Sequence, residues 1–301
     1  MDRLEAMSVL LTAIEAGSLS EAARRLGKPL TTVSRKVSEL EGHLNVRLIN
    51  RSGRQLTLTD AGRSYVDACR RILDDVREAE RSASGEYSEP KGDLVVTAPM
   101  EFGRLHVVPL VAEFLRTYPG INVQLVLADR TMNLVQEKVD VAFRLSNLPD
   151  SSLVAIRMGS SRRVVCGSPT YFAKRGVPKV PSDLSTHDCV TFGGWMSPTA
   201  WTFRSGGSEI VVPIQSRFVV NTAASALDAA LAGAGVTSAL CFQIVTARKS
   251  GALRVVLEDF EREPVPINLL YAAGRFMPQK LRTFCDFVTP RLRATFSKGL
   301  A

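Results

Sequence analysis

Basic side chains gather in one short stretch near the N-terminus. Between Ser20 and Arg54, eight basic residues face only three acidic ones. The basic residues are Arg24, Arg25, Lys28, Arg35, Lys36, Arg47, Arg51 and Arg54. A local basic cluster is the electrostatic pattern of phosphate binding, although charge alone fits an ordinary solvated surface equally well. The elements that carry these side chains decide between the two.

Two short helices around a tight turn are predicted in this stretch. Ser18 and Glu21 have the spacing of a capping box, which would start a helix. The Gly-Lys-Pro segment at residues 27–29 then breaks that helix and opens the next one. An amphipathic helix over residues 2–16 precedes both. Two short helices joined by a glycine-containing turn are typical of a helix-turn-helix.

The second of these helices, over residues 30–44, has the features of a DNA-recognition helix. Apolar residues spaced by 4, 3 and 4 form one stripe, and the opposite face is polar. Short hydroxyl side chains allow such a face to enter the major groove, where Arg35 can reach a guanine edge or a phosphate. The residues predicted to contact DNA from this helix are Leu30, Thr31, Thr32, Ser34, Arg35 and Ser38.

A hairpin with a basic tip is predicted next. Residues 48–50 and 55–58 are short apolar stretches, and the tip between them carries Arg51 and Arg54. Such a hairpin is a wing that lies along the DNA backbone or enters the minor groove, so both arginines are further candidate DNA contacts.

A long helix is predicted after Thr59, whose hydroxyl can cap it. Its apolar residues recur at spacings of 4, 3, 4, 3 and 4, which is a heptad seam. A narrow seam needs a partner, most simply a second copy of the chain; packing on the helix's own domain is the alternative. The predicted dimer-interface residues are Tyr65, Cys69, Ile72, Val76 and Ala79.

Four segments, in order, resemble the DNA-binding region of the LysR family of transcription regulators. They are residues 16–26 (AGSLSEAARRL), 33–41 (VSRKVSELE), 44–51 (LNVRLINR) and 56–62 (LTLTDAG). The resemblance implies a homodimer or homotetramer on double-stranded promoter DNA, with RNA polymerase as a further possible partner. Where the family commonly has Ser-Gln, this chain has Pro29-Leu30, so we expect Leu30 to meet a thymine methyl instead.

Strand and helix patterns alternate after a polar segment at residues 85–92. Strands are predicted at residues 94–97, 123–127, 139–143 and 267–272, and helices at 105–117, 132–138, 223–232 and 278–288. Alternation of this kind predicts parallel sheets with helices on both faces.

This part resembles the LysR effector-binding domain, which has the fold of periplasmic solute-binding proteins. The expected fold is therefore multi-domain: an all-α winged helix-turn-helix (1–58) and a linker helix with hinge (59–91), followed by an α/β effector domain (92–301). The resemblance implies that residues 92–159 with 265–295 form one subdomain and 160–264 the other, with a small-molecule effector in the cleft between them.

Candidate cleft residues follow strands, where open α/β sheets bind ligands. The amides near Pro99, just before a predicted helix, could meet an anion, and Arg144 could pair with a carboxylate. The formal net charge of +8 falls entirely on residues 90–301, which favours an anionic effector. The predicted effector-binding residues are Pro99, Met100, Glu101, Arg130, Thr131, Arg144, Phe192, Asn221 and Thr222.

Other classes of function find little support. The five cysteines show no CxxC or metal-ligand spacing, so we expect neither a metal nor a cofactor, and cysteine oxidation is only an alternative control signal. No catalytic triad, P-loop or dinucleotide motif is found, which argues against an enzyme. The N-terminus has no secretory signal and no apolar stretch is long enough to span a membrane, so we expect a cytoplasmic protein rather than a transport-type solute-binding protein.

Overall fold

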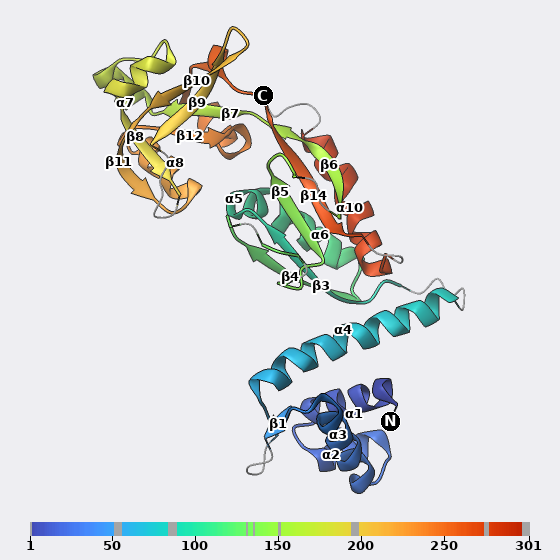
Figure 1. The fold of residues 1–301 in the computed structure, drawn as a ribbon. Coiled ribbons are helices and arrows are strands. Elements are labelled where there is room, and N and C mark those ends of the chain that lie inside the picture. The colour runs from blue at the N-terminus through green and yellow to red at the C-terminus, as the bar shows by residue number, and fades with distance from the viewer. Residues whose placement is uncertain are drawn as a thin grey trace. The chain divides into compact units, whose positions relative to one another are not determined.

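The chain forms two compact units, Met1–Glu89 and Pro90–Ala301 (Figure 1). The computed structural model describes residues 2–50, 56–83, 89–130, 132–134, 136–149, 152–193, 199–273 and 277–296.

Three helices and a hairpin precede a long fourth helix in the first unit, as predicted. They are α1 (Arg3–Glu15), α2 (Leu19–Leu26), α3 (Leu30–Leu44), the antiparallel strands β1 (Ile49–Asn50) and β2 (Thr57–Leu58), and α4 (Asp60–Ala83). The Ser18 hydroxyl caps α2 by accepting a hydrogen bond from the amide of Glu21 at 3.0 Å. The Glu21 carboxylate pairs with Arg24 and Arg25 instead, so only the Ser18 half of the predicted capping box is present.

Glu5 of α1 ties the helix-turn-helix together. Its carboxylate pairs with the ammonium groups of Lys28, in the turn before α3, and of Lys36, on α3 itself. These two cations lower the pKa of Glu5 to about 2, well below the usual value of a glutamate. Two members of the basic cluster are thus already paired within the protein, and α3 is anchored to α1.

The start of α4 lies against the chain that enters β1. The Thr59 hydroxyl accepts a hydrogen bond from the amide of Gly62 at 2.9 Å, which is the predicted cap. A Cβ atom built at Gly62 would lie only 1.9 Å from the backbone oxygen of Leu48. Only glycine therefore allows this close approach of helix and hairpin.

The core of the first unit takes residues from α4 as well as from the helix-turn-helix. Val66, Cys69 and Leu73 of α4 are buried in the same cluster as Val33 and Val37 of α3. The prediction that Cys69 faces a second chain is therefore wrong. Buried positions spaced by 3 and 4 along α4 serve its own unit, so part of the apparent seam is intramolecular core.

The first lobe of the second unit is a five-stranded sheet of order β4-β3-β5-β14-β6. Its strands are β3 (Gly92–Ala98), β4 (Ile121–Leu127), β5 (Val141–Leu145), β6 (Leu153–Ser161) and β14 (Val265–Ala272). Its helical elements are α5 (Met100–Phe102), the π-helical turn η1 (Gly103–Val107), α6 (Val108–Thr117) and α10 (Gln279–Phe296). Strand β3 runs parallel to β4 and β5, whereas β14 runs antiparallel to β5 and β6.

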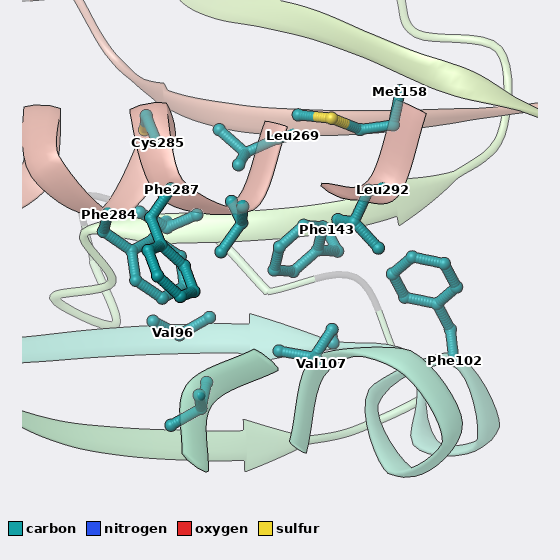
Figure 2. Close-up of a cluster of buried hydrophobic side chains, with 14 of the residues drawn as sticks. Val96, Phe102, Val107, Phe143, Met158, Leu269, Phe284, Cys285, Phe287 and Leu292 are labelled. Carbon is teal, nitrogen blue, oxygen red and sulfur yellow. The ribbon is translucent and has the colours of Figure 1, made fainter. Parts of the chain in front are cut away.

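Aromatic side chains fill the core of this lobe. Figure 2 shows the rings of Phe284 and Phe287 between α10 and the strand that carries Val96. Phe114 of α6 meets Phe284 edge-on, with ring centroids 5.1 Å apart. Phe143 and Phe102 extend the cluster toward the other end of the sheet. The C-terminal helix thus belongs to the same lobe as the first strands after the unit boundary.

The second lobe has a sheet of order β11-β8-β12-β7-β13 and a separate hairpin of β9 and β10. Its strands are β7 (Arg163–Gly167), β8 (Asp188–Phe192), β9 (Ala200–Ser205), β10 (Ser208–Pro213), β11 (Gln215–Val220), β12 (Val236–Leu240) and β13 (Arg254–Val256). Its helices are α7 (Pro169–Arg175), η2 (Pro181–Thr186), α8 (Ala223–Leu231), η3 (Cys241–Gln243), α9 (Val245–Lys249) and η4 (Glu258–Phe260).

The chain passes between the lobes twice, at neighbouring points. It leaves the first lobe after Ser161 at the end of β6 and enters the second at Arg163, the first residue of β7. It returns at Val265, the first residue of β14, which pairs with Ser161. The two crossings are therefore held side by side by the β6–β14 ladder.

The sheets differ from the prediction in that both are mixed rather than parallel. Strand β14 opposes β5 and β6, and β7 opposes β12 and β13. The first crossing joins β6 directly to β7, and the second joins β13 to β14 through the short turn η4, so neither contains the long helix that a parallel connection needs.

Two local predictions are also wrong. The described part of residues 132–138 forms turns rather than a helix: the Asn133 side chain accepts a hydrogen bond from the amide of Gln136 at 3.1 Å, and Lys138 has a positive φ of 56°. Strand β5 runs to Leu145, so Arg144 lies inside the strand rather than after it.

We expect Gly62→Ala to lower the free energy of unfolding of the first unit by about 1–3 kcal/mol, because the methyl group must displace backbone at Leu48. Gly42→Ala is the control: it lies within α3 with nothing within 4 Å of the new Cβ, so it should stabilise by about 0.5–1 kcal/mol. Urea denaturation followed by circular dichroism measures both. Equal midpoints for the two variants would contradict the packing argument.

Candidate functional site

The face of α3 that was predicted to contact DNA is open to solvent. Thr31, Arg35 and Ser38 are exposed, and Thr32 and Ser34 are half-buried. Leu30 at the start of the helix is 47% exposed. Arg51 and Arg54, the predicted wing contacts, lie outside the described residues. The helix therefore has one buried apolar stripe and one polar face, and the apolar residue Leu30 lies at the N-terminal end of that polar face.

Arg35 is the most available cation on this face. Its guanidinium lies 3.6 Å from the Glu39 carboxylate one turn later, and its side chain is 69% exposed. Lys36, by contrast, is held against Glu5 with only 16% of its side chain exposed. A weak surface pair of the Arg35 type costs little to break when a base or phosphate competes for the guanidinium.

The predicted dimer seam on α4 splits into two kinds of position. Cys69 is buried within the unit and Tyr65 is partly buried against the same core. Ile72 is 40% exposed, Val76 is half-buried, and the side chain of Ala79 lies outside the described set. Ile72 and Val76 are thus the apolar positions left to meet another molecule.

A cavity of about 310 Å³ lies between the two lobes of the second unit. Its walls come from the carboxyl ends of β3, β4 and β5 in the first lobe, and from the ends of β8 and β12 with η3 in the second. This is the edge at which open α/β sheets bind ligands, and the volume suits a small molecule.

The cavity brings together five of the nine predicted effector-binding residues: Pro99, Glu101, Arg130, Arg144 and Phe192. Met100, Asn221 and Thr222 are not among the lining residues, and Thr131 lies outside the described residues. Thr222 has a structural role, because its hydroxyl accepts a hydrogen bond from the amide of Ser225 at 3.2 Å and caps α8.

The prediction of free amides near Pro99 is wrong for Met100. The amide of Met100 donates to Asp129 Oδ1 at 2.9 Å, so it is already used. The Glu101 carboxylate pairs with Arg104 on the same helical segment at 2.8 Å. Arg130 similarly pairs with Glu137. Three of the charged side chains around the cavity, Glu101, Asp129 and Arg130, are therefore satisfied by neighbouring protein groups.

Arg144 donates one hydrogen bond to the protein backbone and forms no ion pair with a described residue, although the charge of Glu137 acts on it from a greater distance. Its Nη2 donates to the backbone oxygen of Met132 at 2.7 Å. Burial lowers its pKa, as expected when a charged form is partly removed from water.

Arg163 is a cavity residue that the sequence analysis missed. Its guanidinium makes no ion pair or side-chain hydrogen bond within the described part of the chain, yet surrounding protein and the nearby Arg262 lower its pKa. As the first residue of β7 it pairs with Leu240, the last residue of β12. Because β7 runs antiparallel to β12, the first residue of β7 lies at the edge of the sheet where β12 ends, and this residue is Arg163.

A half-buried histidine contacts both lobes beside this cavity. His106 of η1 packs against Phe242 of the second lobe and Phe296 of α10, with ring centroids 5.2 and 4.8 Å away. Its Nε2 has no hydrogen-bond partner in the described structure, and burial lowers its pKa to about 4. The neutral ring therefore acts at pH 7 as an apolar contact between the lobes.

The described residues hold neither a metal-ligand cluster nor a membrane-spanning helix. No group of three or more His, Cys, Asp or Glu among them could hold a metal ion. In the same part of the chain, no helix has the length and apolar character needed to cross a membrane.

Known proteins match the chain along nearly its whole length. The bacterial regulatory helix-turn-helix protein model of the lysR family matches residues 4–63, and the LysR substrate binding domain model matches residues 88–293. An HTH-type transcriptional regulator of Xanthomonas campestris pv. campestris is 34% identical over 288 residues, which cover 94% of this chain and 84% of that protein. The HTH-type transcriptional activator AaeR of Escherichia coli K12 is 31% identical over 289 residues, covering 96% and 94%.

A solved full-length structure agrees with these matches. CrgA, a LysR-type transcriptional regulator from Neisseria meningitidis, superimposes with a TM-score of 0.63 at 32% identity and covers 96% of this chain and 98% of that one. The chain therefore belongs to the LysR family of transcriptional regulators, with an N-terminal helix-turn-helix and a C-terminal LysR substrate-binding domain.

Proposed function

We propose that this regulator reads double-stranded DNA through α3 and changes its activity when a small anionic effector binds the interlobe cavity. The observation that carries the effector proposal is the pair Arg144 and Arg163. Both line the cavity, and neither has an acidic ion-pair partner among the described residues. Cations that line a cavity without an ion pair favour a ligand that supplies a negative charge.

The neighbouring charges strengthen this argument. Glu101, Asp129 and Arg130 also line the cavity, but each is engaged by another protein group. The ligand therefore meets two available guanidinium groups and no available carboxylate. A carboxylate or phosphate can accept bidentate hydrogen bonds from such a group, each contributing more than a neutral hydrogen bond.

Effector control then follows from the double crossing. A ligand that contacts Arg144 on the first lobe and Arg163 on the second stabilises arrangements in which the two are close. Such a ligand has differential affinity for two lobe arrangements, which is the requirement for allosteric control of DNA binding.

Control by cysteine oxidation is less well supported. All five cysteines are buried, and burial raises the pKa of Cys166, Cys189 and Cys285 to about 12. The thiolate is the reactive form, so these thiols are poorly suited to sensing oxidants.

For DNA binding, we expect Arg35→Ala to lower affinity for the operator by about 1–3 kcal/mol more than for random duplex, if the guanidinium reads a base. Arg25→Ala is a matched control, since Arg25 on α2 forms the same kind of pair with a glutamate at 3.6 Å. Fluorescence anisotropy titrations at two salt concentrations measure both duplexes. An unchanged specificity ratio in Arg35→Ala would mean that Arg35 contacts only phosphate, and unchanged affinity for both duplexes would exclude α3 as the reading helix.

For assembly, we propose that α4 mediates dimerisation through Ile72 and Val76, and we expect Ile72→Asp to split the dimer. Ile72 is exposed in the single chain, so the variant should still fold, whereas a dimer would bury an unpaired charge at a cost of about 3–5 kcal/mol. Arg70→Asp, about 160° away around the helix, is the control and should stay assembled. Sedimentation velocity gives the mass; an Ile72→Asp protein of wild-type mass would place the interface elsewhere.

For the effector, acetate, succinate, citrate and inorganic phosphate are suitable probes of the cavity. Whichever anion raises the thermal midpoint of the wild type should bind Arg144→Ala about 10- to 100-fold more weakly, the loss expected of one charge-assisted contact. Operator affinity without ligand should stay unchanged, and Arg116→Ala, on α6 and outside the cavity, is the control. Equal protection of wild type and Arg144→Ala would remove Arg144 from the ligand site.

A further inference from the structure

A second cavity, of about 380 Å³, lies within the second lobe alone. Its floor is one face of the sheet: Arg163 and Val165 are two residues apart on β7, and Ser238 of β12 pairs with Val165. Its roof is the β9–β10 hairpin, which contributes Trp201 and Thr202. Among the described lining residues it shares only Arg163 and Phe192 with the interlobe cavity, so it opens beside that cavity but its other described walls differ.

One cation dominates the charge of this second cavity. Glu261 lines it but pairs with Arg162 at 3.0 Å, and Arg262 lines it but pairs with Glu209 at 2.6 Å. Arg163 has no such partner in the described part of the chain, and Arg262 opposes its charge. An anion bound at Arg163 would therefore relieve an unfavourable like-charge pair as well as supply hydrogen-bond acceptors.

The rest of the lining suits a flat apolar body. Phe192 and Trp201 are both half-buried, so each presents part of its ring to the cavity, and Val165 and Leu257 add aliphatic surface. Aromatic rings prefer aromatic partners in offset or edge-on contact, beyond the gain from buried area. The hydroxyls of Ser238 and Thr202 supply a small number of polar groups, as in most small-molecule sites.

We propose that this second cavity is a ligand site of its own that takes an aromatic carboxylate. The carboxylate lies on the Arg163 guanidinium at the border with the interlobe cavity, and the ring lies between Phe192 and Trp201 beneath the hairpin. The cavity volume falls within the range of ordinary ligand pockets and accommodates a one- or two-ring acid. Because Arg163 lines both cavities, occupation of this site changes the charge that the interlobe cavity presents to its own effector.

Isothermal titration calorimetry of the full chain with benzoate as probe tests the site. Arg163→Gln and Trp201→Leu should each weaken benzoate binding at least about 10-fold, the loss of one charge-assisted or stacking contact. Arg144→Gln, which lines only the interlobe cavity, and Arg254→Gln, an exposed strand arginine that lines neither, should leave it unchanged. Benzamide and cyclohexanecarboxylate, which lack the charge and the aromatic ring respectively, should bind more weakly than benzoate.

A second measurement locates the ligand with Arg163 and Trp201 both in place. The chain has two tryptophans, so Trp195→Phe leaves Trp201 as the sole tryptophan. Benzoate should then change the emission of Trp201 with the same dissociation constant that calorimetry gives. This readout holds even if Arg163→Gln fails to fold.

Three results would overturn the proposal. They are the absence of benzoate binding up to about 10 mM, which corresponds to a negligible affinity; a loss in Arg144→Gln with none in Trp201→Leu; and unchanged Trp201 emission at saturation. The proposed effector role of the interlobe cavity fails separately, because its test uses non-aromatic anions and Arg144.

Discussion

The double passage of the chain between the lobes is the constraint on which the ligand-binding unit depends. Ser161 and Val265 pair where the chain leaves and re-enters the first lobe, so the lobes are joined by two adjacent strands rather than by one flexible linker. A connection of this kind allows the lobes to open and close but resists their separation. It also sets the position of Arg163, which follows the first crossing by a single residue and therefore always lies at the mouth of the cavity.

In the first unit, by contrast, basic side chains are paired with a carboxylate of the same unit. There the cations of the turn and of α3 are drawn inward by Glu5, and the depressed pKa of Glu5 shows how strongly Lys28 and Lys36 favour its ionised form. A count of charges along the sequence includes these lysines in one basic surface. In the structure, both lysines pair with Glu5 and hold the helices together. Arg35, loosely paired with Glu39, is left on the exposed face of α3. A helix anchored by ion pairs, with one exposed cation, suits contact with a base edge, because fewer side chains have to be ordered on binding.

The sequence analysis was correct where helix caps and apolar periodicity determine the local structure. It failed elsewhere for different physical reasons. The helices of the first unit, the Thr59 cap and the β1–β2 hairpin were predictable because caps and apolar periodicity act over a few residues. The heptad reading of α4 failed at Cys69, since spacing alone does not say which molecule covers a stripe. Arg163 was missed because the search considered only residues that follow strands, whereas an antiparallel strand brings its first residue to that edge. The turns at residues 132–138 depended on the Asn133 side chain bonding to backbone, which helical periodicity does not reveal.

Two cavity arginines of the second unit, Arg144 and Arg163, are the basis of the proposed anion site. A guanidinium that is partly desolvated and lacks a counter-ion costs stability, and a nearby carboxylate would remove that cost, as Glu137 does for Arg130. Arg144 and Arg163 form no ion pair with a described residue, although the charge of Glu137 acts on Arg144 from a distance and Glu101 and Asp129 line the same cavity. In the proposed function, an anion supplies the missing ion pair. Since the two arginines belong to different lobes, the proposed anion is held most strongly when the lobes approach each other, which would couple its binding to lobe closure.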